Sequence, residues 1–117
     1  MTTKQLSDER PWGKWEILLD ENYCKVKRIT VKPHSRLSYQ KHEKREELWT
    51  IVKGEGIVIL KGEKVTVKPG NVVHIPTQAA HRMMNETDEA VIFIEIQRGS
   101  YFGEDDIIRL EDDYGRN

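Results

Sequence analysis

Four side chains in two short segments of this chain could bind a single divalent cation. Gln40, His42 and Glu47 lie in the first segment, and His81 lies in the second. Imidazole and carboxylate groups are ligands for zinc, iron, manganese, cobalt and nickel, and an amide oxygen is a weak neutral ligand. Because this set carries only one negative charge, a bound cation would stay net positive. Such an ion is a good Lewis acid for a sugar oxygen or a carbonyl.

By spacing alone, a plainer interpretation of these four residues is equally acceptable. Histidine, glutamine and glutamate are common on ordinary strands, where they face solvent or are satisfied by polar neighbours. A metal site therefore requires a fold that brings the two segments together.

The sequence around the four residues is typical of short β-strands separated by turns. Segments rich in β-branched and aromatic residues alternate with clusters of Gly, Pro, Asn and Asp, and no segment before Gly99 shows a helical repeat. This pattern predicts an all-β domain, either a sandwich or a barrel of antiparallel strands. One strand is expected around Trp15 to Leu19, and residues 104–110 fit either a helical turn or a last strand. The other strands are expected at residues 24–32, 36–42, 47–53, 56–60, 63–67, 72–75, 81–85 and 90–97.

Length and charge exclude several classes of protein. With 117 residues and a net charge of −1, the chain has room for one domain and offers no overall attraction for nucleic acid or an anionic membrane. No apolar run could span a bilayer, and the polar N-terminus does not resemble a signal peptide. The single cysteine, Cys24, excludes an intramolecular disulfide and fits a reducing, cytoplasmic location. We expect a flexible arm at residues 1–9 and one domain at residues 10–117.

The turn residues around the candidate ligands resemble the two motifs of the cupin superfamily. The first motif is Gly-x5-His-x-His-x4-Glu-x6-Gly, and here it reads His34, Gln40, His42, Glu47 and Gly54. The second is Gly-x5-Pro-x-Gly-x2-His-x3-Asn, and here it reads Gly70, Pro76, Gln78, His81 and Asn85. All spacings are kept, although His34 and Gln78 replace glycines and Gln40 replaces the first histidine. The resemblance implies the cupin double-stranded β-helix, an antiparallel jelly-roll barrel.

A Gln-x-His sequence at this place is similar to that of phosphomannose isomerases. Residues 10–116 as a whole resemble the type II phosphomannose isomerase domain, and the segments that carry the resemblance are 10–13, 25–29, 36–38, 98–107 and 112–116. That domain is usually the C-terminal part of a bifunctional mannose-1-phosphate guanylyltransferase, whose Gly-rich nucleotidyl-transfer loop this chain does not contain. The resemblance implies a stand-alone isomerase of mannose 6-phosphate and fructose 6-phosphate that feeds nucleotide-sugar and polysaccharide biosynthesis. It also implies one divalent metal, zinc first and manganese, cobalt, nickel or iron next, held by Gln40, His42, Glu47 and His81.

Interconversion of an aldose and a ketose moves a proton between C1 and C2 through an enediolate. The reaction needs a base, an electrophile at the oxygens and a clamp for the phosphate. If 36–42 is one regular strand, Arg36 shares the face of the ligands and is a candidate for binding phosphate or the enediolate. Lys27 and Arg28 lie on an adjoining strand, where only one of them can face inward. Glu104 is the first residue of an acidic run, and the resemblance makes it a catalytic candidate. The alternative is that this run is a set of solvated surface charges.

Two other functions fit the same residues. A cupin module could bind a sugar or nucleotide sugar without converting it. A metal-dependent dioxygenase is the third hypothesis, and Gln40 in place of a histidine makes a redox iron site less attractive. The expected partners are a small-molecule sugar phosphate and a second copy of the chain, with no nucleic acid and no membrane. Exposed strand edges and an arm with Trp12 and Trp15 favour a homodimer that shares strands.

Overall fold

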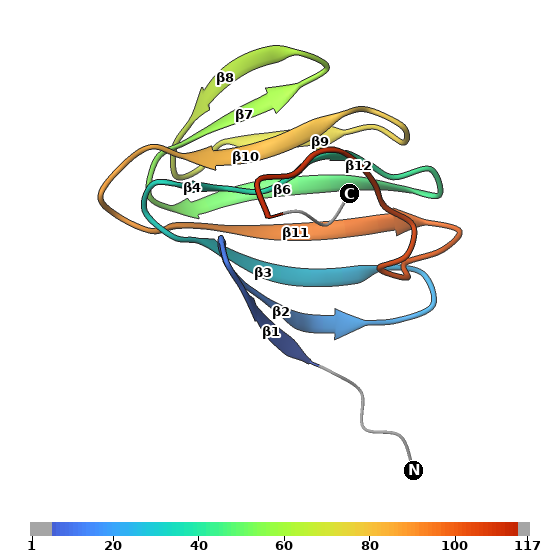
Figure 1. The fold of residues 1–117 in the computed structure, drawn as a ribbon. Coiled ribbons are helices and arrows are strands. Elements are labelled where there is room, and N and C mark those ends of the chain that lie inside the picture. Colours follow the sequence, from blue (N-terminus) through green and yellow to red (C-terminus); the bar gives the residue numbers. More distant parts are fainter. Residues whose placement is uncertain (1–5, 115–117) are drawn as a thin grey trace.

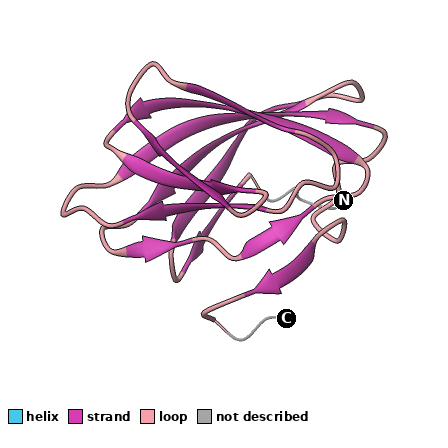
Figure 2. Cartoon of the chain, turned by 90° about the horizontal axis from the view of Figure 1, so that it is seen from above, coloured by secondary structure: helices cyan, strands magenta, loops and turns pink. Residues whose placement is uncertain are grey.

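A computed structural model describes residues 6–114, which fold into β-strands that form two antiparallel sheets (Figure 1). The first sheet has the order β1-β2-β3-β11-β6-β9 and the second the order β12-β5-β10-β7-β8, with β4 also paired to β10. Seen from above, the strands of the two sheets curve around a common interior (Figure 2). The strands of the described chain are β1 (Ser7–Arg10), β2 (Gly13–Asp20), β3 (Lys25–Val31), β4 (Ser35–Arg36), β5 (Tyr39–Lys41), β6 (Arg45–Lys53), β7 (Gly56–Leu60), β8 (Glu63–Val67), β9 (Val72–Ile75), β10 (His81–Asn85), β11 (Val91–Gly99) and β12 (Ile108–Glu111).

The all-β prediction is confirmed, and most strands lie where the periodicity placed them. The strands expected at 56–60, 63–67, 72–75 and 81–85 have those bounds, and those expected at 24–32, 47–53 and 90–97 differ by at most two residues at either end. For residues 104–110 we expected either a helical turn or a last strand. A strand is observed, and it is β12, which lies slightly later in the chain at Ile108–Glu111. Among residues 6–114, no helix is long and apolar enough to cross a membrane.

The central strands β6 and β11 divide the interior into an apolar end and a polar end. Every second residue of each strand is buried, as expected where one face of a sheet covers a core. At one end the buried residues are apolar: Ile51 on β6 pairs with Phe93 on β11. Towards the other end they become polar, and Glu47 pairs with Gln97. The fold therefore has a dry core and, next to it, a cluster of buried polar groups.

The single strand expected at residues 36–42 is wrong. Strand β4 ends at Arg36 and β5 begins at Tyr39, with Leu37 and Ser38 between them. Leu37 is buried in the core, and its backbone N–H donates to the Met83 carbonyl oxygen at 3.0 Å. Because these long-range contacts draw Leu37 inward, the simple alternation along the segment fails. Arg36 and His42 therefore do not share one face.

Residues 7–9 of the arm expected at residues 1–9 form part of a paired strand. These residues belong to β1, which pairs with β2 from Ser7 opposite Glu16 to Arg10 opposite Gly13. The two residues between Arg10 and Gly13 close a tight hairpin, and Trp12 in that turn is 7% exposed because it packs into the core. Residues 1–5 lie outside the described part of the chain.

The two positions where the chain departs from the cupin glycines both have left-handed backbone. The φ angles are 55° at His34 and 68° at Gln78, a region that glycine enters without steric cost. The fold thus keeps the glycine conformation at both places without the glycine, at a cost on the order of 1–2 kcal/mol per residue.

We expect Gly54→Ala to destabilise the protein much more than Gly62→Ala. Both glycines have left-handed backbone, with φ values of 79° and 83°. A Cβ at position 54 would lie 2.3 Å from the Ala90 carbonyl oxygen, whereas one at position 62 would meet nothing within 4 Å. The free energy of unfolding should fall by about 1 kcal/mol for Gly62→Ala and by about 3 kcal/mol for Gly54→Ala, because only the latter adds a backbone clash. Urea denaturation measures both, and equal losses would contradict the prediction.

Candidate metal centre

His42, Glu47 and His81 meet at the polar end of the interior, each arriving from a different place in the fold. His42 directly follows β5, Glu47 lies on β6 and His81 begins β10. Their possible ligand atoms all lie within 4.8 Å of one another, and the three residues are 5%, 2% and 1% exposed. Gln40 on β5 pairs directly with His81 on β10, so the two side chains lie on the same face of their sheet. The fold therefore brings all four predicted ligands together.

His81 presents an unused nitrogen lone pair to this cluster. Its Nδ1 lies 2.8 Å from the Ala79 carbonyl oxygen, which can only accept, so Nδ1 carries the proton. The other ring nitrogen, Nε2, which carries the free lone pair in the neutral form of the ring, is buried and has no hydrogen-bond partner. It lies 3.7 Å from Glu47 Oε1. A buried acceptor without a donor is costly, and this arrangement of one fixed nitrogen and one free nitrogen is the one that metal-binding histidines adopt.

His42 is a neutral imidazole at physiological pH. Burial, together with the charges of Arg45 and His81, lowers the pKa of His42 from 6.5 to about 3. Its Nε2 accepts a hydrogen bond of 2.9 Å from Arg45 Nη2, because a guanidinium has donors only. A neutral imidazole need not lose a proton to bind an ion, but the Nε2 lone pair of His42 would first have to leave its hydrogen bond with Arg45.

Arg45 is a site residue that the sequence reasoning missed. It is 4% exposed, and its Nε donates to Glu47 Oε2 at 2.8 Å. Burial would raise the pKa of Glu47, but the Arg45 guanidinium outweighs it and the pKa is lowered. Arg45 thus supplies positive charge beside two prospective ligands, Glu47 and His42. The available signal was its spacing, since Arg45 stands two residues before Glu47 on the inward face of the same strand.

Two more buried polar residues, Glu95 and Gln97, were also missed. The indole N–H of Trp49 donates to both Glu47 Oε1 and Glu95 Oε1, at 3.0 Å each, and Gln97 Nε2 donates to Glu95 Oε2 at 2.8 Å. Burial, and then the neighbouring Glu47 carboxylate, raise the pKa of Glu95. Strand alternation from Val91 and Phe93 indicates that Glu95 and Gln97 face inward, but it does not reveal what they meet there.

A cavity of about 110 Å³ opens beside the predicted ligands. Gln40, His42 and Glu47 line it, and so do the catalytic candidates Lys27 and Glu104. Of Lys27 and Arg28 on β3, only one was expected to face inward, and it is Lys27. Arg28 is exposed and binds Glu16 on the outer side of the sheet. Lys27 and Glu104 form an ion pair although 77 residues separate them.

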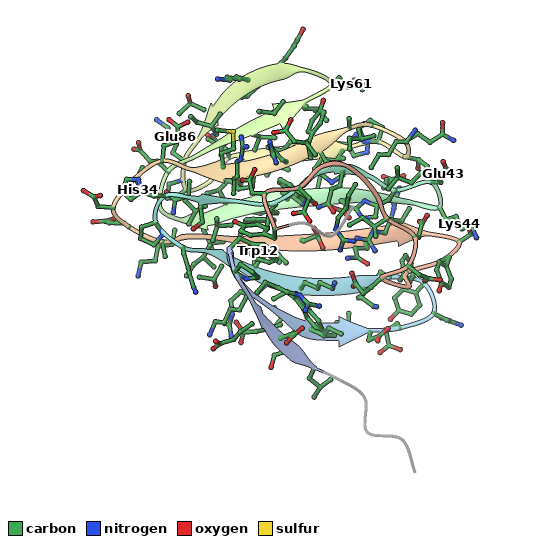
Figure 3. The ribbon with its side chains drawn as sticks, in the orientation of Figure 1. Trp12, His34, Glu43, Lys44, Lys61 and Glu86 are labelled. Carbon is green, nitrogen blue, oxygen red and sulfur yellow. The ribbon has the colours of Figure 1, made fainter. Side chains whose placement is uncertain are left out.

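The structure places the third catalytic candidate, Arg36, away from the candidate metal centre. Its guanidinium binds the Asp113 carboxylate through Nε at 2.6 Å and through Nη2 at 2.8 Å, and this pairing raises the pKa of Arg36. It lines a different cavity, together with His34 and Glu86. These two residues lie at the opposite end of the molecule from Glu43, which follows His42 (Figure 3). The interruption of the strand at Leu37 explains this displacement.

The residues present fit a single divalent cation. Two imidazoles, a buried carboxylate and an amide oxygen form a donor set that zinc and related ions accept. The free Nε2 of His81 is the observation that speaks for a metal, because no protein group among the described residues satisfies it.

Comparison with known proteins decides the family. Residues 2–112 match the family described as mannose-6-phosphate isomerase C-terminal. The chain belongs to this family. It is 44% identical over 108 residues to a mannose-1-phosphate guanylyltransferase of Salmonella montevideo and 42% identical over 107 residues to the xanthan biosynthesis protein XanB of Xanthomonas campestris. In each case the match covers 92% of this chain and 23% of the relative, so the chain spans about a quarter of the length of these relatives.

Solved structures confirm the cupin fold. A Klebsiella pneumoniae protein with a double-stranded β-helix domain superimposes with a TM-score of 0.73 over 83% of this chain and 78% of its own. At 20% identity this likeness shows the fold alone. Membership of the mannose-6-phosphate isomerase C-terminal family and the cupin fold together support a role in sugar metabolism, and one relative is named for xanthan biosynthesis.

Proposed function

We propose that this protein is a metal-dependent isomerase of mannose 6-phosphate and fructose 6-phosphate, acting in the cytoplasm to supply polysaccharide biosynthesis. The observation that carries the proposal is the meeting of Gln40, His42, Glu47 and His81 beside a cavity, in a chain of the mannose-6-phosphate isomerase C-terminal family. Bound by these four residues, a divalent ion would supply an electrophile for the oxygens of the sugar.

The chain's own residues add two features that such a reaction requires. The Arg45 guanidinium is buried beside the ligands, where a fixed positive charge stabilises negative charge that develops on an enediolate oxygen. Trp49 and Gln97 hold the carboxyl groups of Glu47 and Glu95 by hydrogen bonds, so the cluster is organised before a substrate enters. These residues are part of the buried face of β6 and β11.

Proton NMR in heavy water would test the isomerase. Metal-loaded protein incubated with mannose 6-phosphate should produce fructose 6-phosphate, and deuterium should appear at C2 of the recovered mannose 6-phosphate because the enediolate exchanges its proton with solvent. A chelator should stop the reaction, and added zinc should restore it. Thermal stabilisation by mannose 6-phosphate without any product would instead identify a sugar-binding module.

We also propose that the chain forms a homodimer through its strand edges. Within residues 6–114, β1 is the last strand of its sheet, and an unpaired edge is a template for a strand from a second copy. Trp12 and Trp15 do not contribute to such an interface, because both are buried in the core of their own chain. Light scattering at micromolar concentration should give twice the mass of 13.7 kDa, and a strict monomer would contradict the proposal.

A further inference from the structure

The cavity beside the candidate metal centre carries an excess of positive charge. Among the described residues, its lining contains four cationic side chains and three carboxyl groups, one of which is that of Glu95. The cationic side chains are Arg10, Lys27, Arg45 and Arg109, and the other two carboxyl groups are those of Glu47 and Glu104. A divalent ion would add to this excess. The charge balance therefore favours an anionic ligand.

Lys27 is a buried cation in this lining whose ion-pair partner is an exposed side chain. It is 3% exposed, its Nζ lies 4.7 Å from the centre of the Trp15 ring, and it forms an ion pair with Glu104. A buried ammonium without a counter-charge is costly, by several kcal/mol in typical cases. Lys27 therefore has to bind an anion, and Glu104 supplies one in this structure.

Glu104 is a counter-ion that could leave without disturbing the fold. Its side chain is 55% exposed and belongs to the segment between β11 and β12, which runs past the end of β3 (Figure 1). Other contacts hold this segment in place. The Phe102 carbonyl oxygen accepts a hydrogen bond of 3.0 Å from Lys25 Nζ. The Asp106 carboxylate accepts hydrogen bonds from the backbone N–H groups that follow His42, at 3.2 and 2.9 Å.

We propose that Lys27 is the anion-binding residue of the cavity and that the Glu104 carboxylate is its internal competitor, which the phosphate group of a substrate displaces. A phosphate dianion carries more charge than a carboxylate and offers three acceptor oxygens to the ammonium. The naming of a sugar phosphate as the ligand rests on the proposed isomerase, whereas the anion site itself rests on the Lys27–Glu104 pair. Gln40 and His42 line the same cavity as Lys27, so a substrate whose phosphate is bound at Lys27 would place its sugar in the cavity that they line.

Removal of the competitor should tighten phosphate binding. We would titrate inorganic phosphate, and separately mannose 6-phosphate, into the full chain by calorimetry, with and without a chelator. Glu104→Gln should lower the dissociation constant for both ligands by about three- to tenfold, because the neutral amide no longer competes for Lys27. The matched control is Asp105→Asn. It removes the same charge from the residue next to Glu104, and the Asp105 carboxylate accepts a hydrogen bond from the Tyr101 hydroxyl. It should change the constant by less than about twofold.

Variants of Lys27 complete the test. Lys27→Gln should weaken binding of both anions by about tenfold or more in the presence or absence of Glu104, while Lys27→Arg keeps the charge and should retain binding. Thermal melting would identify a variant that fails to fold. If Lys27→Gln does not fold, phosphate binding by Lys27→Arg is compared with that of the unmodified protein instead. Unchanged or weaker phosphate binding by Glu104→Gln would overturn the inference.

The outcomes for the anion site and for the isomerase are separable. Tighter phosphate binding by Glu104→Gln in a protein that never produces fructose 6-phosphate would support the anion site and contradict the isomerase. Isomerase activity together with unchanged phosphate binding by Glu104→Gln would support the isomerase and contradict the anion site. Tightening for inorganic phosphate but not for mannose 6-phosphate would support the Lys27 site for free phosphate and contradict displacement of Glu104 by a sugar phosphate.

Discussion

Replacing His81 with alanine should weaken zinc binding by on the order of 100- to 1,000-fold and should abolish isomerase activity. The imidazole Nε2 of His81 is the only buried histidine nitrogen in the described chain that lacks any hydrogen-bond partner, so it is free to bind an ion. Without it, the candidate centre keeps Gln40, His42 and Glu47, of which the last two are already engaged by Arg45. Competition with a chromophoric chelator would measure the zinc affinity.

The matched control for this experiment is His74→Ala. His74 lies on β9 with its side chain 55% exposed, and its Nε2 is 3.2 Å from the Glu46 carboxylate on the outer side of the sheet. Its removal should leave zinc affinity and activity unchanged within about twofold. Without metal, His81→Ala should remain folded but lose about 2–3 kcal/mol of unfolding free energy, because it empties a buried volume and leaves the Ala79 carbonyl without its donor. Equal zinc affinity in the two variants would rule out His81 as a ligand.

Replacing Arg45 with methionine should destabilise the metal-free protein by about 3–5 kcal/mol at neutral pH, because the fully buried Glu47 loses its main positive partner. Methionine preserves much of the length and volume of the side chain, so the loss reports mainly on charge. Zinc should reverse much of this loss, since an ion bound to Glu47 and His42 replaces the missing positive charge. Urea denaturation with and without zinc gives both numbers.

The control for this second experiment is Arg98→Met. Arg98 is 69% exposed and is 3.4 Å from Glu46, an exposed pairing that contributes little to stability. Its replacement should change the free energy of unfolding by no more than about 0.5 kcal/mol, and zinc should have the same effect as on the unmodified protein. If Arg45→Met is no less stable than Arg98→Met, the Arg45–Glu47 pair is not what maintains the buried carboxylate.

Much of the site could be predicted from the sequence because the information is local or follows a motif. Gln40, His42, Glu47 and His81 stand at the spacings of the two cupin motifs, and the structure brings them together. The strands around them were predictable because a sheet with one buried face requires alternation, and the turns between them carry Gly, Pro, Asn and Asp. These signals depend on neighbouring residues and need no knowledge of long-range contacts.

The rest was decided by the tertiary structure. Glu95 lies at an inward position that alternation could have indicated, but only the pairing of β6 with β11 places it beside the residues of β6 around Glu47. Lys27 meets Glu104 across 77 residues, and no local pattern relates the two. Arg36 was misplaced because Leu37 packs into the core and interrupts its strand.

Sequence alone therefore determined the ligand types and the β framework, since both follow from local chemistry and periodicity. Only the closing of two sheets around one interior decided which charges share it. In that interior a buried charge must find a counter-charge wherever the fold supplies one, as Lys27 does with Glu104 and Arg45 with Glu47.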